Sequence, residues 1–213
     1  MQTVTLASGK GGSARSTTAL ALAIHCHHAG HKAAIVDMDP GQGVLQRWFA
    51  MREKPGPLLV TPQLKVDKEL KALAADGVDY VFIDTEPAVD EDSIVEAGIA
   101  FCDFCLIPVR PSFFDVTSIG AVVEMCKDLD RAYAVVLCDV DERKAWQGVA
   151  STAAKVLRTQ GRLLTHEIHH RVAYVNALTR GLTGDEINEA ARNETAELWK
   201  EVRALLPKRG RHG

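Results

Sequence analysis

The chain has 213 residues, of which 46% are apolar and 25% are charged. This length and balance are typical of one globular domain and exclude a largely disordered chain. The formal net charge of −3 excludes strong attraction of the whole protein to nucleic acid or anionic lipid, so any such contact needs a local basic patch.

Short β-branched runs alternate with longer segments of helical periodicity along the chain. Strands are expected at residues 3–7, 33–37, 80–84, 104–109 and 133–137, with a sixth at 163–168. Helices are expected at residues 16–29, 44–51, 67–75, 92–100, 116–129, 145–160 and 185–206. The Pro-rich stretch at 55–62 predicts a surface loop or an irregular edge.

Near-continuous apolar strands separated by helices are typical of a parallel sheet that is covered on both faces. We therefore predict an α/β fold with a doubly wound, mostly parallel sheet. A single domain is expected at residues 1–207, followed by a basic, flexible tail at 208–213. The last long helix carries an apolar stripe, which predicts packing on the sheet.

A glycine-rich segment, KGGSARST at residues 10–17, lies between the first strand and the first helix. Glycines at such a junction let backbone amides wrap around phosphate oxygens, and the start of the helix faces the anion. Gly9 and Ser16 match the first glycine and the Mg²⁺-binding hydroxyl of the standard P-loop GxxxxGK[ST]. Ala14 and Arg15 replace its Gly-Lys pair. The pattern alone leaves a structural turn and a phosphate-binding loop equally open.

Acidic residues stand at the ends of successive expected strands. Asp37 and Asp39 follow the second strand in the sequence DMDP, and Asp84 ends the third. The fourth strand runs into IPVRPSFFD at residues 107–115. The carboxyl ends of parallel strands meet at the crevice where α/β sheets bind ligands. There, one carboxylate could hold a metal-bound water and another could orient an attacking water.

Together these segments resemble the ParA/MinD family of deviant Walker-A ATPases, and especially its small ParA members without an N-terminal DNA-binding domain. The family's loop is KGGxGK[ST][ST], followed by DxDP, by a strand ending in Asp and by IPVxPSxxD. The match runs through nearly the whole chain and includes residues 171–174 followed by Gly181. The resemblance implies a P-loop NTPase fold of the deviant Walker-A class that binds ATP or ADP with Mg²⁺.

The resemblance also implies roles for the matching positions. Lys10 would reach across an ATP-bound dimer to the partner's phosphates, Arg15 would stand at the lysine position of the loop, and Asp39 would orient the hydrolytic water. The implied Mg²⁺ site consists of Ser16, Asp37 and the Walker-B carboxylate Asp84. The implied nucleotide contacts are Gly11, Gly12, Ser13, Ala14, Arg15, Ser16 and Thr17, with Pro108 and Pro111 beside the base and ribose.

Two loop positions depart from the family pattern. Ala14 replaces a glycine whose missing side chain allows close approach to phosphate. Arg15 replaces a lysine, and its planar guanidinium is bulkier than the lysine ammonium. Losing one transition-state charge contact could cost about 3–4 kcal/mol. The stretch 40–43 also has an extra residue before the expected glutamine. Slow hydrolysis, binding without turnover and loss of the nucleotide all remain open.

The leading hypothesis is a ParA-type ATP-dependent switch for DNA partition or cargo positioning, with weak ATPase activity. It implies an ATP-sandwich homodimer, non-specific DNA binding, a small centromere-binding or adaptor protein as partner, and a nucleoid-associated location in the cytoplasm. Candidate DNA contacts are Arg143, Lys144, Arg158, Arg162, Arg171, Arg180, Lys208, Arg209 and Arg211. The alternatives are a dimerising pseudo-ATPase adaptor and an iron–sulfur relative from the iron-protein branch of the superfamily.

The remaining patterns give weaker signals. The five cysteines are an odd number, and most lie in apolar stretches, which favours reduced thiols in a cytoplasm. The lone CxxC pair, Cys102 and Cys105, lacks the four ligands of a structural zinc site. Histidines at 25–31 and 166–170 are expected to be solvated rather than to bind a metal. No apolar run approaches the roughly 20 residues that cross a bilayer, and no secretory leader is evident, so we expect no membrane contact.

Overall fold

The computed structural model describes residues 1–39, 41, 43–62, 65–87 and 94–208. Within these residues, seven strands form one parallel sheet in the order β3-β2-β4-β1-β5-β6-β7. The strands are β1 (Gln2–Leu6), β2 (Ala33–Asp37), β3 (Leu58–Val60), β4 (Tyr80–Asp84), β5 (Phe104–Val109), β6 (Tyr133–Val140) and β7 (Ile168–His169). The predicted parallel α/β architecture is confirmed.

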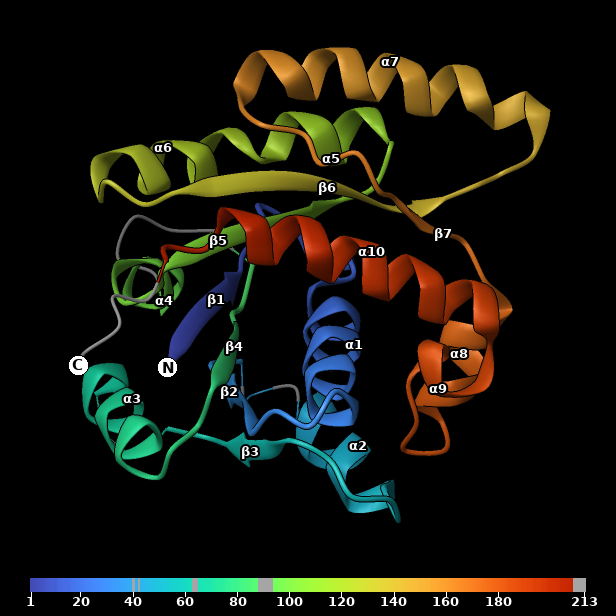
Figure 1. Ribbon diagram of the computed structural model, residues 1–213. Helices are drawn as coiled ribbons and strands as arrows, with labels where there is room; N and C mark the ends of the chain where they lie inside the picture. The colour runs from blue at the N-terminus through green and yellow to red at the C-terminus, as the bar shows by residue number, and fades with distance from the viewer. Residues whose placement is uncertain (40, 42, 63–64, 88–93, 209–213) are drawn as a thin grey trace.

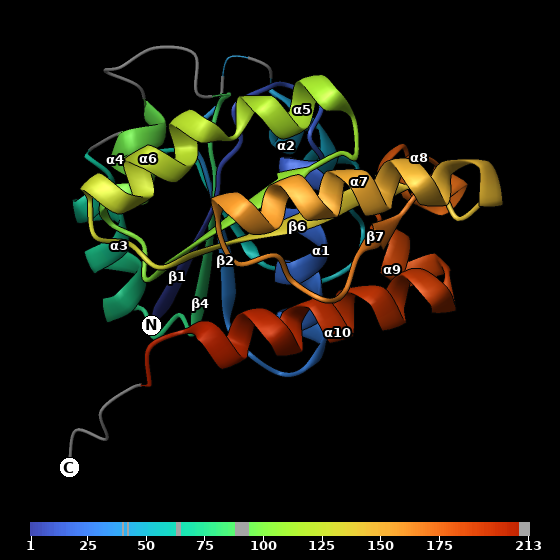
Figure 2. The ribbon, with the colours of Figure 1, turned by 90° about the horizontal axis from the view of Figure 1, so that it is seen from above.

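Helices cover both faces of the sheet, as Figure 1 shows. They are α1 (Arg15–His28), α2 (Val44–Met51), α3 (Val66–Ala75), α4 (Ile94–Ala100), α5 (Phe113–Ser118), α6 (Gly120–Asp128), α7 (Lys144–Gln160), α8 (Val172–Leu178), α9 (Gly184–Ile187) and α10 (Glu189–Leu205). Seen from above in Figure 2, α10 runs along one face while α4 and α6 lie on the other.

The two faces of each strand supply two different cores. Leu6 of β1 and Leu106 of β5 pack with α1, α2 and α10, whereas Cys105 and Ile107 pack with α4, α6 and α7. This division follows from the alternation of side chains along a strand. It explains why the strands are apolar at nearly every position, because both of their faces are covered.

The boundaries of several elements differ from the sequence expectation. The first strand begins one residue earlier than expected, and the Pro-rich stretch carries β3 at the edge of the sheet. The expected strand at 163–168 is wrong in extent, because Leu163 makes only an isolated bridge to Val135 before the two-residue β7. The helix expected at 116–129 is divided into α5 and α6, which meet at Ile119. Residues 92–93, the expected start of α4, lie outside the described residues.

The helix expected at 185–206 is also divided. Asn188 has an extended backbone, with φ −139° and ψ 126°, and its side chain accepts a hydrogen bond from the Ala191 N–H at 2.9 Å. This side-chain cap starts α10 as a separate helix after the short α9. The predicted apolar stripe is confirmed, because Leu198, Trp199 and Val202 are buried against the sheet.

The cysteines belong to the core. All five are free and buried, and burial raises the pKa of the Cys102 thiol to about 11. Buried thiols with raised pKa values are poor ligands, so their placement argues against the iron–sulfur alternative. No helix among the described residues combines the length and hydrophobicity needed to cross a membrane.

Candidate functional site

The glycine-rich loop connects β1 to α1 and is shaped by residues that tolerate unusual backbone geometry. A Cβ atom at Gly9 would lie 1.8 Å from the Ser118 carbonyl oxygen, so only glycine fits there. Gly12 has φ +76°, and Ala14, the N-cap of α1, has φ 71°. The first turn of α1 contains no acidic residue. Its unpaired N–H groups and positive dipole end therefore favour an anion at this loop.

Arg15 is turned back into the loop rather than out to solvent. Its relative exposure is only 8%, and its Nη1 donates hydrogen bonds to the Ser8 hydroxyl and, at 3.2 Å, to the Lys10 carbonyl oxygen. Burial lowers the pKa of Arg15, while the charges of Asp84, Asp39 and Glu86 oppose this shift. The guanidinium of Arg15, the residue that aligns with the lysine of a standard P-loop, is thus hydrogen-bonded to the loop itself.

The predicted metal-site carboxylates lie side by side next to this loop. Asp37 and Asp84 are paired in register at the ends of β2 and β4, and both are 2% exposed. Asp37 accepts hydrogen bonds from the Asp39 N–H at 3.0 Å and from Gln46 Nε2 at 2.6 Å. Burial raises the pKa of Asp37, and these two hydrogen bonds lower it in part.

Asp84 has the more strongly perturbed carboxyl group. Burial raises the pKa of Asp84 to about 7, and a hydrogen bond with the Ser16 side chain and the charge of Arg15 oppose that shift. Ser16 and Asp84, predicted to share one metal site from distant parts of the sequence, are thus brought together. A cation here would favour the ionised carboxylate, because a nearby positive charge lowers a carboxyl pKa.

The loop residues fit a phosphate and a divalent cation. Arg15 Nε and Asp84 Oδ1 are both buried and have no hydrogen-bond partner among the described residues. A buried polar atom without a partner is costly. A phosphate oxygen would satisfy the first atom, and a metal-bound water would satisfy the second. A Cβ at Gly11 would meet nothing closer than the Pro87 side chain at 3.9 Å, so the loop is open on that side.

Lys10 contacts residues of α5 in the same chain. Its Nζ lies 3.8 Å from Asp115 Oδ1 and 5.5 Å from the centroid of the Phe114 ring. Asp115 is buried and also accepts hydrogen bonds from Arg110 Nε at 3.0 Å and Ser112 Oγ at 2.7 Å. Asp115 is a site residue that the sequence analysis did not single out. Asp115 could have been found from the sequence, because it is the last residue of the segment IPVRPSFFD.

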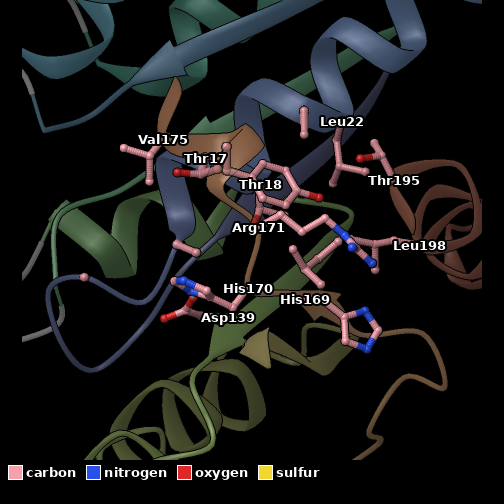
Figure 3. Close-up of a pocket in the computed structure, with 15 residues that line it drawn as sticks. Thr17, Thr18, Leu22, Asp139, His169, His170, Arg171, Val175, Thr195 and Leu198 are labelled. Atoms are coloured by element: carbon pink, nitrogen blue, oxygen red, sulfur yellow. The ribbon is translucent and has the colours of Figure 1, made fainter. Parts of the chain in front are cut away.

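A cavity of about 280 Å³ opens beside the loop. Figure 3 shows that Thr17 and Thr18 of α1 form part of its wall, and that Asp139 and His170 lie side by side at one end. His170 Nδ1 is 2.5 Å from Asp139 Oδ1, and Asp139 has φ 58°. Asp139 lies near the end of β6, and His170 follows β7. The sequence did not single out Asp139, and it predicted only a solvated side chain for His170.

The two prolines expected beside the base, Pro108 and Pro111, lie in and just after β5. Pro108 is buried within β5, where it is paired with Val136. Pro111 lines a neighbouring pocket together with Arg110, Ser112 and Asp115, and this pocket shares Asp139 and His170 with the cavity beside the loop. The cavity next to Thr17 is walled by residues of α1, α8 and α10 and by the ends of β6 and β7.

Two of the expected DNA contacts already have acidic partners. Arg171 pairs with Glu194 and, at 3.4 Å, with Glu142, and Arg143 pairs with Asp141. Arg209 and Arg211 lie outside the described residues, as does most of the expected basic tail. Among the described residues there is also no cluster of three or more histidine, cysteine or acidic side chains arranged to hold a metal ion.

The sequence matches a known family model over most of its length. Residues 4–183 match the CobQ/CobB/MinD/ParA nucleotide binding domain. The chain is 27% identical over 214 residues to the Maintenance of carboxysome distribution protein A of Halothiobacillus neapolitanus, and the match covers 96% of each protein. It is also 27% identical over 212 residues to a Protein ParA of Rhizobium radiobacter, covering 93% of this chain and 94% of that protein.

Solved structures share the same fold. A chain of the MinC:MinD cell division protein complex of Aquifex aeolicus superposes with a TM-score of 0.81 at 15% identity, and the match covers all of both chains. The septum site-determining protein MinD of Pyrococcus horikoshii, complexed with Mg-ADP, superposes with a TM-score of 0.73 at 15% identity and covers 94% of this chain and 95% of that one. These similarities identify the fold of the sheet and its loop.

Proposed function

The chain belongs to the CobQ/CobB/MinD/ParA nucleotide-binding family, and on that premise we propose that it is a ParA-type ATP-dependent switch that positions DNA or another cargo. The observation that carries this proposal is the meeting of Ser16, Asp37 and Asp84 next to an anion-favouring loop. Such a set suits a magnesium nucleotide, because Mg²⁺ prefers oxygen ligands and is usually bound by a few protein oxygens together with the phosphates of a substrate.

Each residue has a definite task in this proposal. The N–H groups of the loop bind the phosphates, Ser16 is the protein ligand of Mg²⁺, and Asp37 and Asp84 hold its bound waters. The ion neutralises phosphate charge. Asp39 orients the hydrolytic water, and Lys10 contacts the phosphates of a second subunit. Thr17 contacts a phosphate and also lines the cavity, which binds the base and ribose.

We expect slow turnover. Ala14 places a methyl group where close approach to phosphate favours glycine, and Arg15 offers a planar fork in place of a compact ammonium. A second candidate, a pseudo-ATPase adaptor that dimerises without turnover, is favoured by the same two residues. Binding and hydrolysis must therefore be measured separately.

The proposed assembly is a homodimer that binds DNA non-specifically and responds to a small centromere-binding or adaptor protein in the cytoplasm. Arg143 and Arg171 are already paired with acids, so we expect them to contribute less to DNA contact than the rest of the set. The remaining candidates within the described residues are Lys144, Arg158, Arg162, Arg180 and Lys208.

Calorimetric titration with Mg-ATP and Mg-ADP tests the nucleotide site. We expect saturable binding by the natural protein and at least about tenfold weaker binding by Ser16→Ala, because the substitution removes a charge-assisted contact to the metal. Ser151→Ala, on the exposed face of α7, is the matched serine control and should bind normally. If the natural protein binds neither nucleotide, the proposal is wrong.

Phosphate release and DNA retention separate the two candidates. The switch requires ATP-dependent DNA binding that weakens steeply between about 50 and 200 mM salt, because phosphate contacts release counterions. It also requires measurable phosphate release, faster in the double variant Ala14→Gly/Arg15→Lys. Tight nucleotide binding without any phosphate release would favour the adaptor. DNA retention that does not change with salt would show that the proposed basic residues do not contact DNA phosphates.

A further inference from the structure

Two buried serines, Ser8 and Ser13, form a hydrogen-bond network with Arg15 and the backbone of the loop. Ser13 Oγ donates a hydrogen bond to Ser8 Oγ at 2.7 Å, and Ser8 Oγ donates to the Lys10 carbonyl oxygen at 2.8 Å. Arg15 Nη1 donates to the same Ser8 oxygen. A hydroxyl group has one proton and two acceptor positions. Ser8 therefore uses its full hydrogen-bonding capacity, with Ser13 and Arg15 as its two donors.

We propose that Ser8 and Ser13 are positioning residues for Arg15, which hold its guanidinium in the loop at the place of the usual lysine. This inference rests on the proposed nucleotide site. Ser13 fills the variable position of the family's loop motif, and Ser8 lies just before the loop. Their exposed fractions are 5% and 2%, so neither hydroxyl can rely on water, and each depends on the network for its hydrogen bonds.

The chemistry of arginine explains why such support is needed. A lysine ammonium is a compact charge with rotatable donors, whereas a guanidinium is a rigid fork that needs acceptors at fixed places in its plane. Ser8 and the Lys10 carbonyl supply two acceptors for Nη1. Both acceptors bind the same nitrogen, so the guanidinium is held in place through Nη1 alone.

The rest of the fork has no hydrogen-bond partner among the described residues. Nε is buried without a partner among the described residues, and neither of the hydrogen bonds that Arg15 donates uses Nη2. An Nε–Nη2 edge binds two phosphate oxygens in parallel. The serines thus hold one end of the guanidinium so that its other edge can meet the phosphates of the nucleotide.

A double-mutant cycle on nucleotide affinity tests this coupling. Mg-ADP affinity is measured by calorimetry for the natural protein and for Ser13→Ala, Arg15→Lys and the Ser13→Ala/Arg15→Lys pair. We expect Ser13→Ala to weaken binding about 3- to 10-fold when Arg15 is present, the range for one lost hydrogen bond. In the Arg15→Lys background the same change should have an effect of less than about twofold, because the ammonium does not need the oriented Ser8 acceptor.

Two further variants exclude a general effect on folding. Ser13→Thr retains the hydroxyl and should recover most of the affinity, and Ser151→Ala should change neither affinity nor unfolding temperature. Equal losses from Ser13→Ala in the Arg15 and Lys backgrounds, or no rescue by threonine, would overturn the positioning role while leaving the nucleotide site intact. Absence of nucleotide binding by the natural protein would instead overturn the proposed function, and this inference with it.

Discussion

Ala14 adopts a backbone conformation that its side chain disfavours. Its φ of 71° and ψ of 21° are left-handed helical values at the N-cap of α1, and it makes no side-chain cap hydrogen bond. The left-handed conformation costs a residue with a Cβ roughly 1–2 kcal/mol, whereas glycine adopts it readily. The junction between the loop and α1 therefore stores strain at the position where the family motif has glycine.

Relieving this strain should stabilise the protein. We expect Ala14→Gly to raise the free energy of unfolding by about 1 kcal/mol in the absence of nucleotide, as measured by urea denaturation. The matched control is Ala150→Gly, in the interior of α7, which should lower it by roughly 0.5–1 kcal/mol because glycine weakens a helix. A loss of stability in Ala14→Gly would show that the alanine is not strained.

The identity of the site residues was more predictable than their contacts. Ser16, Asp37 and Asp84 could be predicted to lie together because each stands at a fixed place in a local motif, and the topology of a parallel sheet brings strand ends together. The inward turn of Arg15 and the pairing of Lys10 with Asp115 depend on side-chain conformations that are chosen in the folded chain. The pairing of His170 with Asp139 was not predicted, because the sequence indicated only a solvated histidine there and no local motif marks Asp139.

At the scale of elements, a buried ion pair joins α2 to α9. Arg52, at the end of α2, donates two hydrogen bonds to Glu186, at 2.9 and 3.1 Å, and one to the Gly181 carbonyl oxygen. The two side chains are 3% and 2% exposed. Glu186 also closes the capping box of Thr183 that starts α9. The pair therefore connects the end of α2, which follows Asp39 in the chain, to the turn and helix that follow α8.

Breaking this pair should be costly. Glu186→Gln leaves the Arg52 charge buried without its counter-ion, and we expect a loss of about 3 kcal/mol at pH 7 in urea denaturation. Burial opposes ionisation, but Arg52 and Thr183 together place the pKa of Glu186 below its ordinary value of 4.5. Its contribution is therefore present above that value and is lost as the pH falls below it, so the difference between the two proteins should shrink in acid.

An exposed ion pair provides the control for this prediction. Lys71 and Asp67 are 3.4 Å apart on the surface of α3, and the lysine is 78% exposed. Lys71→Gln should change the unfolding free energy by less than about 0.5 kcal/mol at any pH, because solvent screens such pairs. If Glu186→Gln were equally mild, α2 and α9 would not be joined through this contact.

Element boundaries were the least predictable part of the fold. The break at Asn188 depends on one side chain capping a new helix within a continuous apolar pattern. α8 was missed because Val172 and Val175 are exposed, at 66% and 63%, and give no amphipathic signal. β3 and β7 are too short for alternation to define them. The longer strands and helices carried enough periodicity to be found.

At the scale of the whole molecule, the contact of Lys10 bears on assembly. The proposed dimer needs Lys10 to reach the phosphates of a second subunit, yet in the single chain its ammonium lies against Asp115 and the Phe114 ring. Dimer formation must therefore break this contact. The contact is weak, because Lys10 is 52% exposed and partly solvated, so it can act as a modest barrier to assembly.

Weakening the contact should favour the dimer. We expect Asp115→Asn to lower the protein concentration at half-dimerisation in Mg-ATP by about threefold, within the range for a partly exposed ion pair. The cap of α5 is the hydrogen bond that the Asp115 N–H donates to Ser112 Oγ, which the substitution leaves in place, and asparagine retains an acceptor for the Ser112 hydroxyl. Sedimentation equilibrium measures the shift, with Glu124→Gln on the exposed face of α6 as the charge-matched control. Lys10→Ala should abolish the ATP-dependent dimer both in the natural protein and in Asp115→Asn. If Asp115→Asn dimerises less readily than the natural protein, Asp115 supports the interface rather than restraining Lys10.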